Sequence, residues 1–322
     1  MTVPALRLGT RRSALALTQS TIVADLLRGR LGRDVELVEI ATEGDTSAAP
    51  LAQLGGTGVF VSALRDALLD GRVDLAVHSL KDLPTAPYDG IALAAVPDRE
   101  DPRDVVVARD GLTLGELPAG STIGTGSPRR AAQLHALGLG LDVLDIRGNV
   151  DTRIGKVRTG DYDAVVLARA GLARLGRLDE ATEVLDPLQL LPAPGQGALA
   201  VECRADDADL VATLATLEDP RSRAAVDAER AVLATLEGGC SAPIGALAEV
   251  VEGEDGDELW VRAVALSRDG ALTVRMSASG DPADAVGVGT RLAREMLADG
   301  AAELDQHLTS TTPAAPAKRQ NA

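Results

Sequence analysis

A single cysteine stands in a loop of small residues, and its thiol is the first candidate for chemistry in this chain. Cys240 follows Gly238-Gly239 and precedes Ser241-Ala242-Pro243, a composition typical of a loop with an accessible backbone. A reachable thiol can form a covalent bond, so we interpret Cys240 as a covalent attachment site, with a small buried residue as the alternative. The second cysteine, Cys203, lies in an apolar run typical of a strand, where we expect a core residue.

Arginines gather where strands turn into helices. In the segment 123–134, Ser127 is placed to cap a helix whose first position is Pro128, so Arg129 and Arg130 fall in the first turn. Cations there oppose the helix dipole by about 0.3 to 1 kcal/mol each, so helix stability does not explain them. Free backbone N–H groups and two guanidinium groups would instead bind an anion. Solvated surface charges are the alternative.

The same arrangement occurs twice more. Ser13 opens a helix shortly after Arg11, and Asn149 is the expected helix cap between Arg147 and Arg153. Three helix N-termini flanked by arginines indicate a binding site for a molecule with many carboxylates or phosphates. The sequence has no Gly-x-x-x-x-Gly-Lys-Ser/Thr segment, which argues against a nucleotide phosphate loop.

The composition narrows the classes of partner. The 322 residues carry a net charge of −16, and one Trp, two Tyr and one Phe leave few rings for stacking bases, so we expect no nucleic acid partner. Two cysteines in different contexts favour a reducing compartment. No run approaches the roughly 18 apolar residues of a membrane span, and the N-terminus has no signal-peptide pattern. We therefore expect a cytoplasmic protein with no membrane partner.

A weak internal repeat indicates two lobes of one design. The similar strands at 71–77 and 160–166 are each preceded, at a distance, by a strand and a Gly-Thr turn, and strands alternate with helical stretches. This predicts an α/β fold with two lobes like those of periplasmic binding proteins, mainly parallel sheets, and a small α+β C-terminal domain. The predicted boundaries are 1–98 with 195–218 for lobe one, 99–194 for lobe two, 219–308 for the C-terminal domain that carries Cys240, and 309–322 for a disordered tail.

A two-lobed α/β fold with an anion-binding cleft also fits a solute-binding protein for a small polycarboxylate, but short motifs favour an enzyme. In chain order they are Arg11-x-Ser13 with Leu15-Ala16, Gly55-Gly56-x-Gly58, Ala76-Val77-His78-Ser79-Leu80-Lys81-Asp82-Leu83-Pro84, Arg99-Glu100-Asp101-Pro102-Arg103-Asp104, Arg129-Arg130, Arg147-Gly148-Asn149, Gly195-Gln196-Gly197-Ala198 and Glu237-Gly238-Gly239-Cys240. With these motifs the chain resembles the porphobilinogen deaminase, or hydroxymethylbilane synthase, family up to about residue 308.

The resemblance implies a transferase of porphyrin and heme biosynthesis. Members of that family join four porphobilinogen molecules head to tail, release ammonia at each step, and hydrolyse off the linear tetrapyrrole preuroporphyrinogen. Their chain grows on a dipyrromethane cofactor, which a thioether joins to the cysteine that matches Cys240. The resemblance also implies a monomer whose product passes to uroporphyrinogen-III synthase. The acetate and propionate groups of cofactor and product would then be the anions that the arginines bind.

The site residues carried over from the family fall into two groups. Besides Cys240, the expected cofactor-binding residues are Ser13, Ser79, Lys81, Asp82, Thr125, Ser127, Arg129, Arg130, Arg147 and Gln196. The expected substrate-binding residues are Arg11, Ser13, Phe60, Arg147, Arg153 and Arg174, and no metal is expected.

Asp82 is the expected catalytic residue. The resemblance implies that loss of ammonia leaves a cationic azafulvene, which a carboxylate near the pyrrole N–H groups can stabilise while it moves protons. Asp82 follows the strand at 74–77, at the end where open α/β sheets carry reactive groups. An ordinary turn aspartate is the alternative, and we expect His78 to be a structural neighbour rather than a base.

The chain departs from the family at the Gly-Gly-x-Gly loop. Gln53 and Thr57 stand where members often carry lysines. Phe60 follows this loop at the place where the family uses a ring to cover pyrroles, and core packing is its alternative role.

Overall fold

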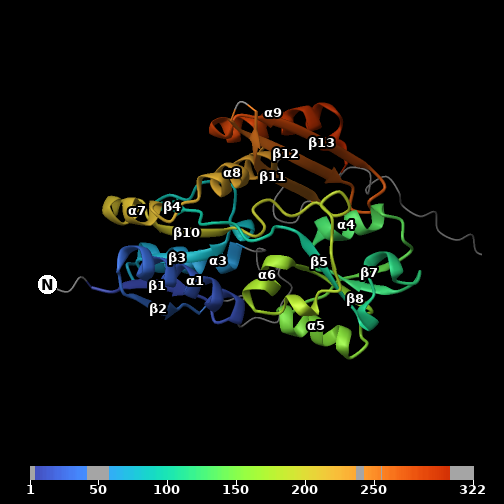
Figure 1. Ribbon diagram of the computed structural model, residues 1–322, viewed down its shortest axis with the longest axis horizontal. Coiled ribbons are helices and arrows are strands. Elements are labelled where there is room, and N and C mark those ends of the chain that lie inside the picture. Colours follow the sequence, from blue (N-terminus) through green and yellow to red (C-terminus); the bar gives the residue numbers. More distant parts are fainter. Residues whose placement is uncertain (1–3, 42–57, 237–242, 255, 305–322) are drawn as a thin grey trace, which may run out of the picture.

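Short apolar strands build three sheets in the computed structural model, which describes residues 4–41, 58–236, 243–254 and 256–304. Each sheet is the centre of one body. Figure 1 shows two of them side by side in its lower half and the third above them. We call them lobe one, lobe two and the C-terminal domain, in the order of their first strands. The boundaries predicted for these bodies remain a proposal.

Lobe one is built on a five-stranded sheet in the order β2-β1-β3-β10-β4. Parallel pairing joins β1 to β2 and β3, while β10 runs antiparallel to both β3 and β4. The helices α1, α3 and α7 pack on this sheet. The bounds are β1 (Leu6–Thr10), α1 (Ala14–Leu31), β2 (Val35–Glu39), α3 (Gly58–Leu69), β3 (Leu75–Ser79), β4 (Ile91–Ala95), β10 (Leu199–Arg204) and α7 (Ala208–Ala215).

Lobe two repeats this plan with the order β7-β6-β8-β5-β9. Here β6 is parallel to β7 and β8, and β5 is antiparallel to β8 and β9. The bounds are β5 (Asp104–Ala108), β6 (Thr122–Gly124), α4 (Pro128–Ala136), β7 (Asp142–Leu144), α5 (Val150–Arg158), β8 (Ala164–Ala168), α6 (Arg169–Arg174) and β9 (Glu183–Val184).

The predicted fold class is confirmed, with one refinement. Each five-stranded sheet formed by the described residues is mixed, with two parallel and two antiparallel pairings. The reason is the course of the chain, because β5 and β10 begin directly after the chain crosses from one lobe to the other. They enter each sheet at the edge where the parallel strands end, so they must run the opposite way.

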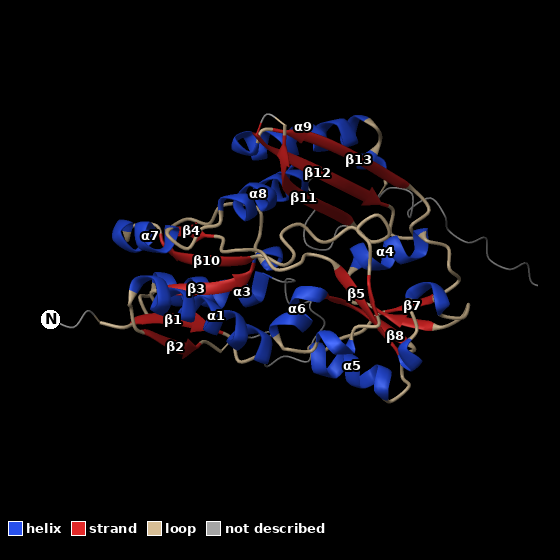
Figure 2. Cartoon of the chain, in the orientation of Figure 1, coloured by secondary structure: helices blue, strands red, loops and turns tan. Residues whose placement is uncertain are grey.

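The C-terminal domain is an antiparallel sheet covered on one face by two helices (Figure 2). Its elements are α8 (Pro220–Thr235), β11 (Ile244–Gly253), β12 (Gly256–Leu266), β13 (Thr273–Gly280) and α9 (Ala285–Ala298). Small residues let α8 and α9 approach closely, since a Cβ atom at Gly289 would overlap the carbonyl oxygen of Ala228. The core of this domain lies between the sheet and the helix pair.

Two crossings, 97–103 and 191–198, join the lobes. They touch at Gly197, whose φ of +88° and closeness to the Glu100 carbonyl oxygen leave no room for a side chain. The remaining short elements are the 3-10 turns η1 (Leu80–Asp82), η2 (Arg109–Gly111), η3 (Leu114–Glu116), η4 (Leu178–Glu180), η5 (Pro282–Asp284) and η6 (Ala301–Glu303). Among the described residues, none of the helices has both the length and the apolar character needed to cross a bilayer.

Candidate active site

Three of the predicted residues lie at the carboxyl end of β3, on the side of lobe one where the two crossings lie. Ser79 is the last residue of β3, and the turn η1 then carries Lys81 and Asp82. The fully buried Leu80 anchors this turn, and its backbone N–H donates to the carbonyl of Ala198 in the return crossing. Lys81 and Asp82 are half-buried. Within the described part of the chain, the Asp82 carboxylate takes part in no hydrogen bond or ion pair, which leaves its oxygens available for chemistry.

Gln196 connects the η1 turn to lobe two. Its side chain is buried, with 1% exposed. The Oε1 atom accepts a hydrogen bond from Nζ of Lys81 at 3.2 Å, and Nε2 donates to Asp104 Oδ1 at 2.7 Å and to the Pro102 carbonyl at 2.6 Å. One amide therefore bridges a residue of lobe one, a crossing and the first residue of β5.

Asp104 is a buried carboxylate that receives both arginines of the α4 N-terminus. Nη2 of Arg129 lies 2.8 Å from Oδ2 of Asp104, and Nη2 of Arg130 lies 2.7 Å from Oδ1. Burial alone would raise the pKa of Asp104, but the charges and hydrogen bonds of Arg130 and Arg129 hold it far below the ordinary aspartate value. Arg129 also donates to the Leu191 carbonyl, and Arg130 to the Val166 carbonyl at 3.0 Å.

The arginines at α4 are thus buried rather than solvated. Ser127 caps the helix as predicted by accepting from the Arg130 N–H at 3.4 Å, and Thr125 accepts from the Ser127 N–H at 3.2 Å. The Nε atoms of Arg129 and Arg130 are buried and, among the described residues, have no hydrogen-bond partner. Each guanidinium therefore keeps donor capacity beyond what Asp104 uses.

Lys81 adds a third cation to this cluster. Burial, and next the charge of Arg130, lower the pKa of Lys81 to about 8, while Asp82 and Asp104 act in the opposite direction. Arg129, Arg130 and Lys81 together outnumber Asp104, so the cluster has an excess of positive charge in a partly desolvated place. This excess is what a ligand with carboxylates would neutralise.

The other predicted arginines of lobe two lie at different depths. Nε of Arg153 donates to the Gly148 carbonyl at 2.8 Å, and burial and the charge of Arg130 lower the pKa of Arg153. Nη2 of Arg174 donates to the Gly197 carbonyl at 2.6 Å, and burial lowers its pKa. Arg147 is exposed and lies 3.5 Å from Asp145.

Three further predicted residues lie in lobe one: Arg11 and Ser13 between β1 and α1, and Ser79 at the end of β3. Ser13 caps α1 as predicted and accepts from the Ala16 N–H at 3.3 Å. Ser79 accepts from Nε2 of Gln19, on the same helix, at 2.9 Å. Arg11 is half-buried just after β1. Since α1 packs against α6 of lobe two, the helix that Ser13 caps lies at the boundary between the lobes (Figure 1).

Several predictions fall outside the described residues. They concern Cys240, Gln53, Thr57 and the side chain of Phe60, which is the third residue of α3. Cys203 is fully buried, and burial together with the charge of Asp207 raises its thiol pKa to about 11. It is a core residue, as predicted.

Three carboxylates that are buried in the described part of the chain received no role from the sequence, namely Asp104, Glu229 and Glu202, the last of which pairs with Arg65 and His78. Asp104 is the last residue of the motif 99–104. It comes directly before the apolar residues of β5, where a carboxylate would be buried and would need cationic partners, and this position is the one sequence feature that could have indicated its role. Glu229 of α8 is fully buried and accepts from Arg99 at 2.7 and 3.0 Å and from the backbone N–H groups of Gly195 and Ala248 at 2.6 and 2.8 Å. It ties the C-terminal domain to both crossings.

Two family models match the chain. Residues 6–212 match the one described as porphobilinogen deaminase, dipyromethane cofactor binding domain, and residues 224–298 match the one described as porphobilinogen deaminase, C-terminal domain. The chain is 59% identical over 313 residues to porphobilinogen deaminase 1 of Streptomyces coelicolor, with 94% of this chain and 98% of that relative covered. It is 60% identical over 304 residues to porphobilinogen deaminase of Mycobacterium tuberculosis, with 93% and 98% covered.

Solved structures give a looser likeness. The methionine binding protein MetQ aligns at 12% identity with a TM-score of 0.43, over 66% of this chain and 89% of that one. A periplasmic substrate-binding protein of an ABC transporter from Coxiella burnetii aligns at 14% identity with a TM-score of 0.43, over 67% and 92%. Superpositions at this level say nothing about the ligand of this chain.

Proposed function

The chain belongs to the porphobilinogen deaminase family, and from this premise we propose how its residues divide the work. Its activity is that of the family, a transferase of tetrapyrrole synthesis with porphobilinogen as substrate. The observation that best supports these residue roles is the cluster of Lys81, Arg129 and Arg130 around one buried carboxylate. A solute-binding protein has only the partial fold likeness in its favour.

The cationic cluster binds the carboxylates of the dipyrromethane cofactor and of the porphobilinogen units that extend it. Buried guanidinium N–H groups without a partner in the described residues, at Arg129 and Arg130, support this role, because a buried donor needs an acceptor. Ser13, Ser79, Thr125, Ser127 and Gln196 keep the surrounding turns in place and supply further polar contacts. Arg11, Arg147, Arg153 and Arg174 receive the substrate and the growing chain, with the ring of Phe60 covering the pyrroles.

Asp82 acts as the catalytic carboxylate. Its oxygens stabilise the positive charge that develops on the pyrrole when ammonia leaves, and they carry a proton between donor and acceptor rings. Two features support this role: the position of Asp82 after β3, beside Lys81, and the absence of a partner for its carboxylate among the described residues. The half-buried setting strengthens the interaction with a cation relative to water.

Cys240 holds the cofactor through a thioether. When bound, the dipyrromethane supplies the pyrrole carbon on which the chain of porphobilinogen units grows. The match of residues 6–212 to a dipyromethane cofactor binding domain supports the group, and the burial and raised thiol pKa of Cys203 support the choice of cysteine.

An intact mass spectrum tests this attachment. The purified chain is expected to exceed its sequence mass by two linked pyrrole units, and the excess should survive thiol reductants because a thioether is not a disulfide. Cys240→Ser should lack both the added mass and the activity, whereas Cys203→Ser should keep both. An active chain of unmodified mass, or added mass on Cys203, would contradict the assignment.

The setting of the enzyme completes the proposal. We place it in the cytoplasm as a monomer that binds neither nucleic acid nor membrane and delivers its product to uroporphyrinogen-III synthase. Size-exclusion chromatography with light scattering, with and without porphobilinogen, checks the oligomeric state.

A further inference from the structure

We propose that Asp104 is a positioning residue of the reaction, which holds Arg129, Arg130 and, through Gln196, Lys81 in one cationic array that spans both lobes. This inference rests on the proposed function of these cations as carboxylate binders. It assigns to Asp104 a role in substrate binding rather than in stability alone.

Both oxygens of Asp104 are used to fix donors from separate elements. Oδ1 accepts from Arg130 at 2.7 Å and from Gln196 at 2.7 Å, and Oδ2 accepts from Arg129 at 2.8 Å. The arginines come from α4 and the amide from the return crossing. Because Asp104 is fully buried, no bulk water competes for these hydrogen bonds. Its position therefore sets the directions of all three side chains.

The bridge to lobe one depends on which way the Gln196 amide faces. Its Nε2 group points at Asp104 and at the Pro102 carbonyl, both of which can only accept, so Oε1 is left to face Lys81. An asparagine at position 104 could present either its oxygen or its NH₂ group, so only the Pro102 carbonyl would still fix the direction of the Gln196 amide. The carboxylate and this carbonyl together determine that Lys81 meets an acceptor.

The charge of Asp104 also acts on Lys81 directly. Four charged groups influence Lys81: Arg129 and Arg130 from α4, Asp104 from β5 and Asp82 from its own turn. The two arginines oppose protonation of the amine, and the two aspartates favour it. Without the negative charge at Asp104, Lys81 would face two arginines with only Asp82 in support. The amine would then lose its proton at lower pH, and the site would lose one of its cations.

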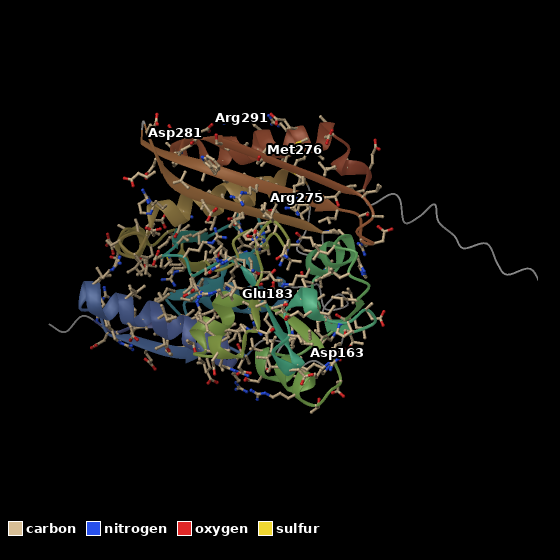
Figure 3. The ribbon with its side chains drawn as sticks, turned by 45° about the vertical axis from the view of Figure 1, so that its right-hand side comes forward. Asp163, Glu183, Arg275, Met276, Asp281 and Arg291 are labelled. Atoms are coloured by element: carbon tan, nitrogen blue, oxygen red, sulfur yellow. The ribbon has the colours of Figure 1, made fainter. Side chains whose placement is uncertain are left out.

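The test compares Asp104→Asn with a matched variant of the same sheet. Asp163→Asn is the control, because Asp163 also bonds an arginine, with Nε of Arg109 2.6 Å from its Oδ1, and it accepts from the Thr122 N–H at 2.7 Å. In the register of β5 and β8, Asp104 pairs with Ala168, whereas Asp163 directly precedes Ala164 at the other end of β8. Figure 3 labels Asp163 low in lobe two.

The readout is the titration of Lys81 in the full chain labelled with ¹⁵N-lysine. The sequence holds three lysines, Lys81, Lys156 and Lys318, so few signals arise, and Lys81→Arg assigns the one of interest. Asp104→Asn should lower the titration midpoint of Lys81 by about one pH unit or more, the size expected for the loss of one close opposite charge. Lys156 should not move, and Asp163→Asn should leave Lys81 unchanged. Intact mass first confirms equal cofactor loading of the chains compared.

Kinetics provide the second readout. Asp104→Asn should raise KM for porphobilinogen at least about tenfold with a smaller fall in kcat, because charged hydrogen bonds to carboxylates are weakened while Asp82 stays. The alkaline limb of kcat/KM should move to lower pH in step with Lys81. A less stable Asp104→Asn chain whose Lys81 midpoint and alkaline limb match the unchanged chain would show a purely structural role and overturn the proposal.

A second variant covers the case in which Asp104→Asn does not fold. Gln196→Met keeps the carboxylate and both arginines but removes the acceptor for Lys81, so its Lys81 midpoint should also fall. An unchanged midpoint would refute the bridge. The NMR titration does not require turnover, so it tests this inference independently of the proposed catalytic roles. An unmodified mass or an active Asp82→Asn would show that those roles are wrong. An unchanged Lys81 midpoint would show that this inference is wrong.

Discussion

Single residues decide what this site can do, and Asp82 is the sharpest case. Asp82→Asn should keep the fold and the cofactor but lower kcat by about 10²- to 10⁴-fold, because the amide preserves shape and removes the charge that handles protons and cations. Single-turnover kinetics with porphobilinogen measure the loss. Asp89→Asn, at an exposed position of the following loop, is the matched control and should leave kcat unchanged. Near-normal turnover in Asp82→Asn would remove Asp82 from the mechanism.

The pH dependence of substrate binding follows from Lys81. Burial and the charge of Arg130 lower its pKa to about 8, so the charged form is lost as pH rises through about 8, well below the pH at which an ordinary lysine loses its proton. KM for porphobilinogen should therefore rise above pH 8. Lys81→Arg should flatten this rise, because arginine stays charged, whereas Lys156→Arg on α5 should not. A KM that is flat from pH 7 to 9 in the unchanged chain would show that Lys81 does not bind carboxylates.

For single residues, the sequence predicted the contacts that are made between residues close together in the chain. Ser13, Ser127 and Asn149 are helix caps because each bonds a backbone N–H three residues on, a relation that can be read from the sequence. Asp104 meets partners 25, 26 and 92 residues away, and Glu229 meets Arg99 across 130 residues. Such pairings exist only once the sheets and crossings have assembled, so sequence patterns gave no partner for either carboxylate.

The close packing of α8 and α9 depends on a glycine at a position where no side chain fits. Gly289→Ala should destabilise the chain by about 1 to 3 kcal/mol, because its Cβ would overlap the Ala228 carbonyl and force α8 and α9 apart. Gly29→Ala in α1 is the control. With open space around it, the change should be neutral or stabilise by up to about 1 kcal/mol through helix propensity. Urea denaturation measures both, and equal effects of the two substitutions would contradict the close contact of α8 and α9.

The strands of the two lobes could largely be predicted from the sequence, but the direction in which each strand runs in its sheet could not. The Gly-Thr turns and the repeated strands indicated two similar sheets, and β3 and β8 are those strands. Local patterns do not reveal that β5 and β10 run against their neighbours, since an apolar run has no direction. The direction follows from where the two crossings enter each sheet.

Across the whole molecule, buried and exposed ion pairs stabilise the fold with unequal strength. Glu229→Gln should cost about 3 to 5 kcal/mol of unfolding free energy, because Arg99, in the crossing between the lobes, would remain buried without its counter-charge. The Arg221–Asp257 pair joins α8 to β12 within the C-terminal domain, but both side chains are about half exposed, so Asp257→Asn should cost less than about 1 kcal/mol. Guanidinium denaturation of both variants gives the comparison.

The same substitution also probes how the C-terminal domain supports the site. Glu229 holds the Gly195 N–H, and Arg99, which it positions, donates to the Gln196 carbonyl at 2.8 Å, so loosening Glu229 should disturb the amide that faces Lys81. Glu229→Gln should therefore raise KM for porphobilinogen at temperatures well below its unfolding midpoint, while Asp257→Asn should not. If Glu229→Gln loses stability but binds substrate normally, Glu229 stabilises the fold without affecting the cationic cluster. The crossings would then hold Gln196 in place without help from the C-terminal domain.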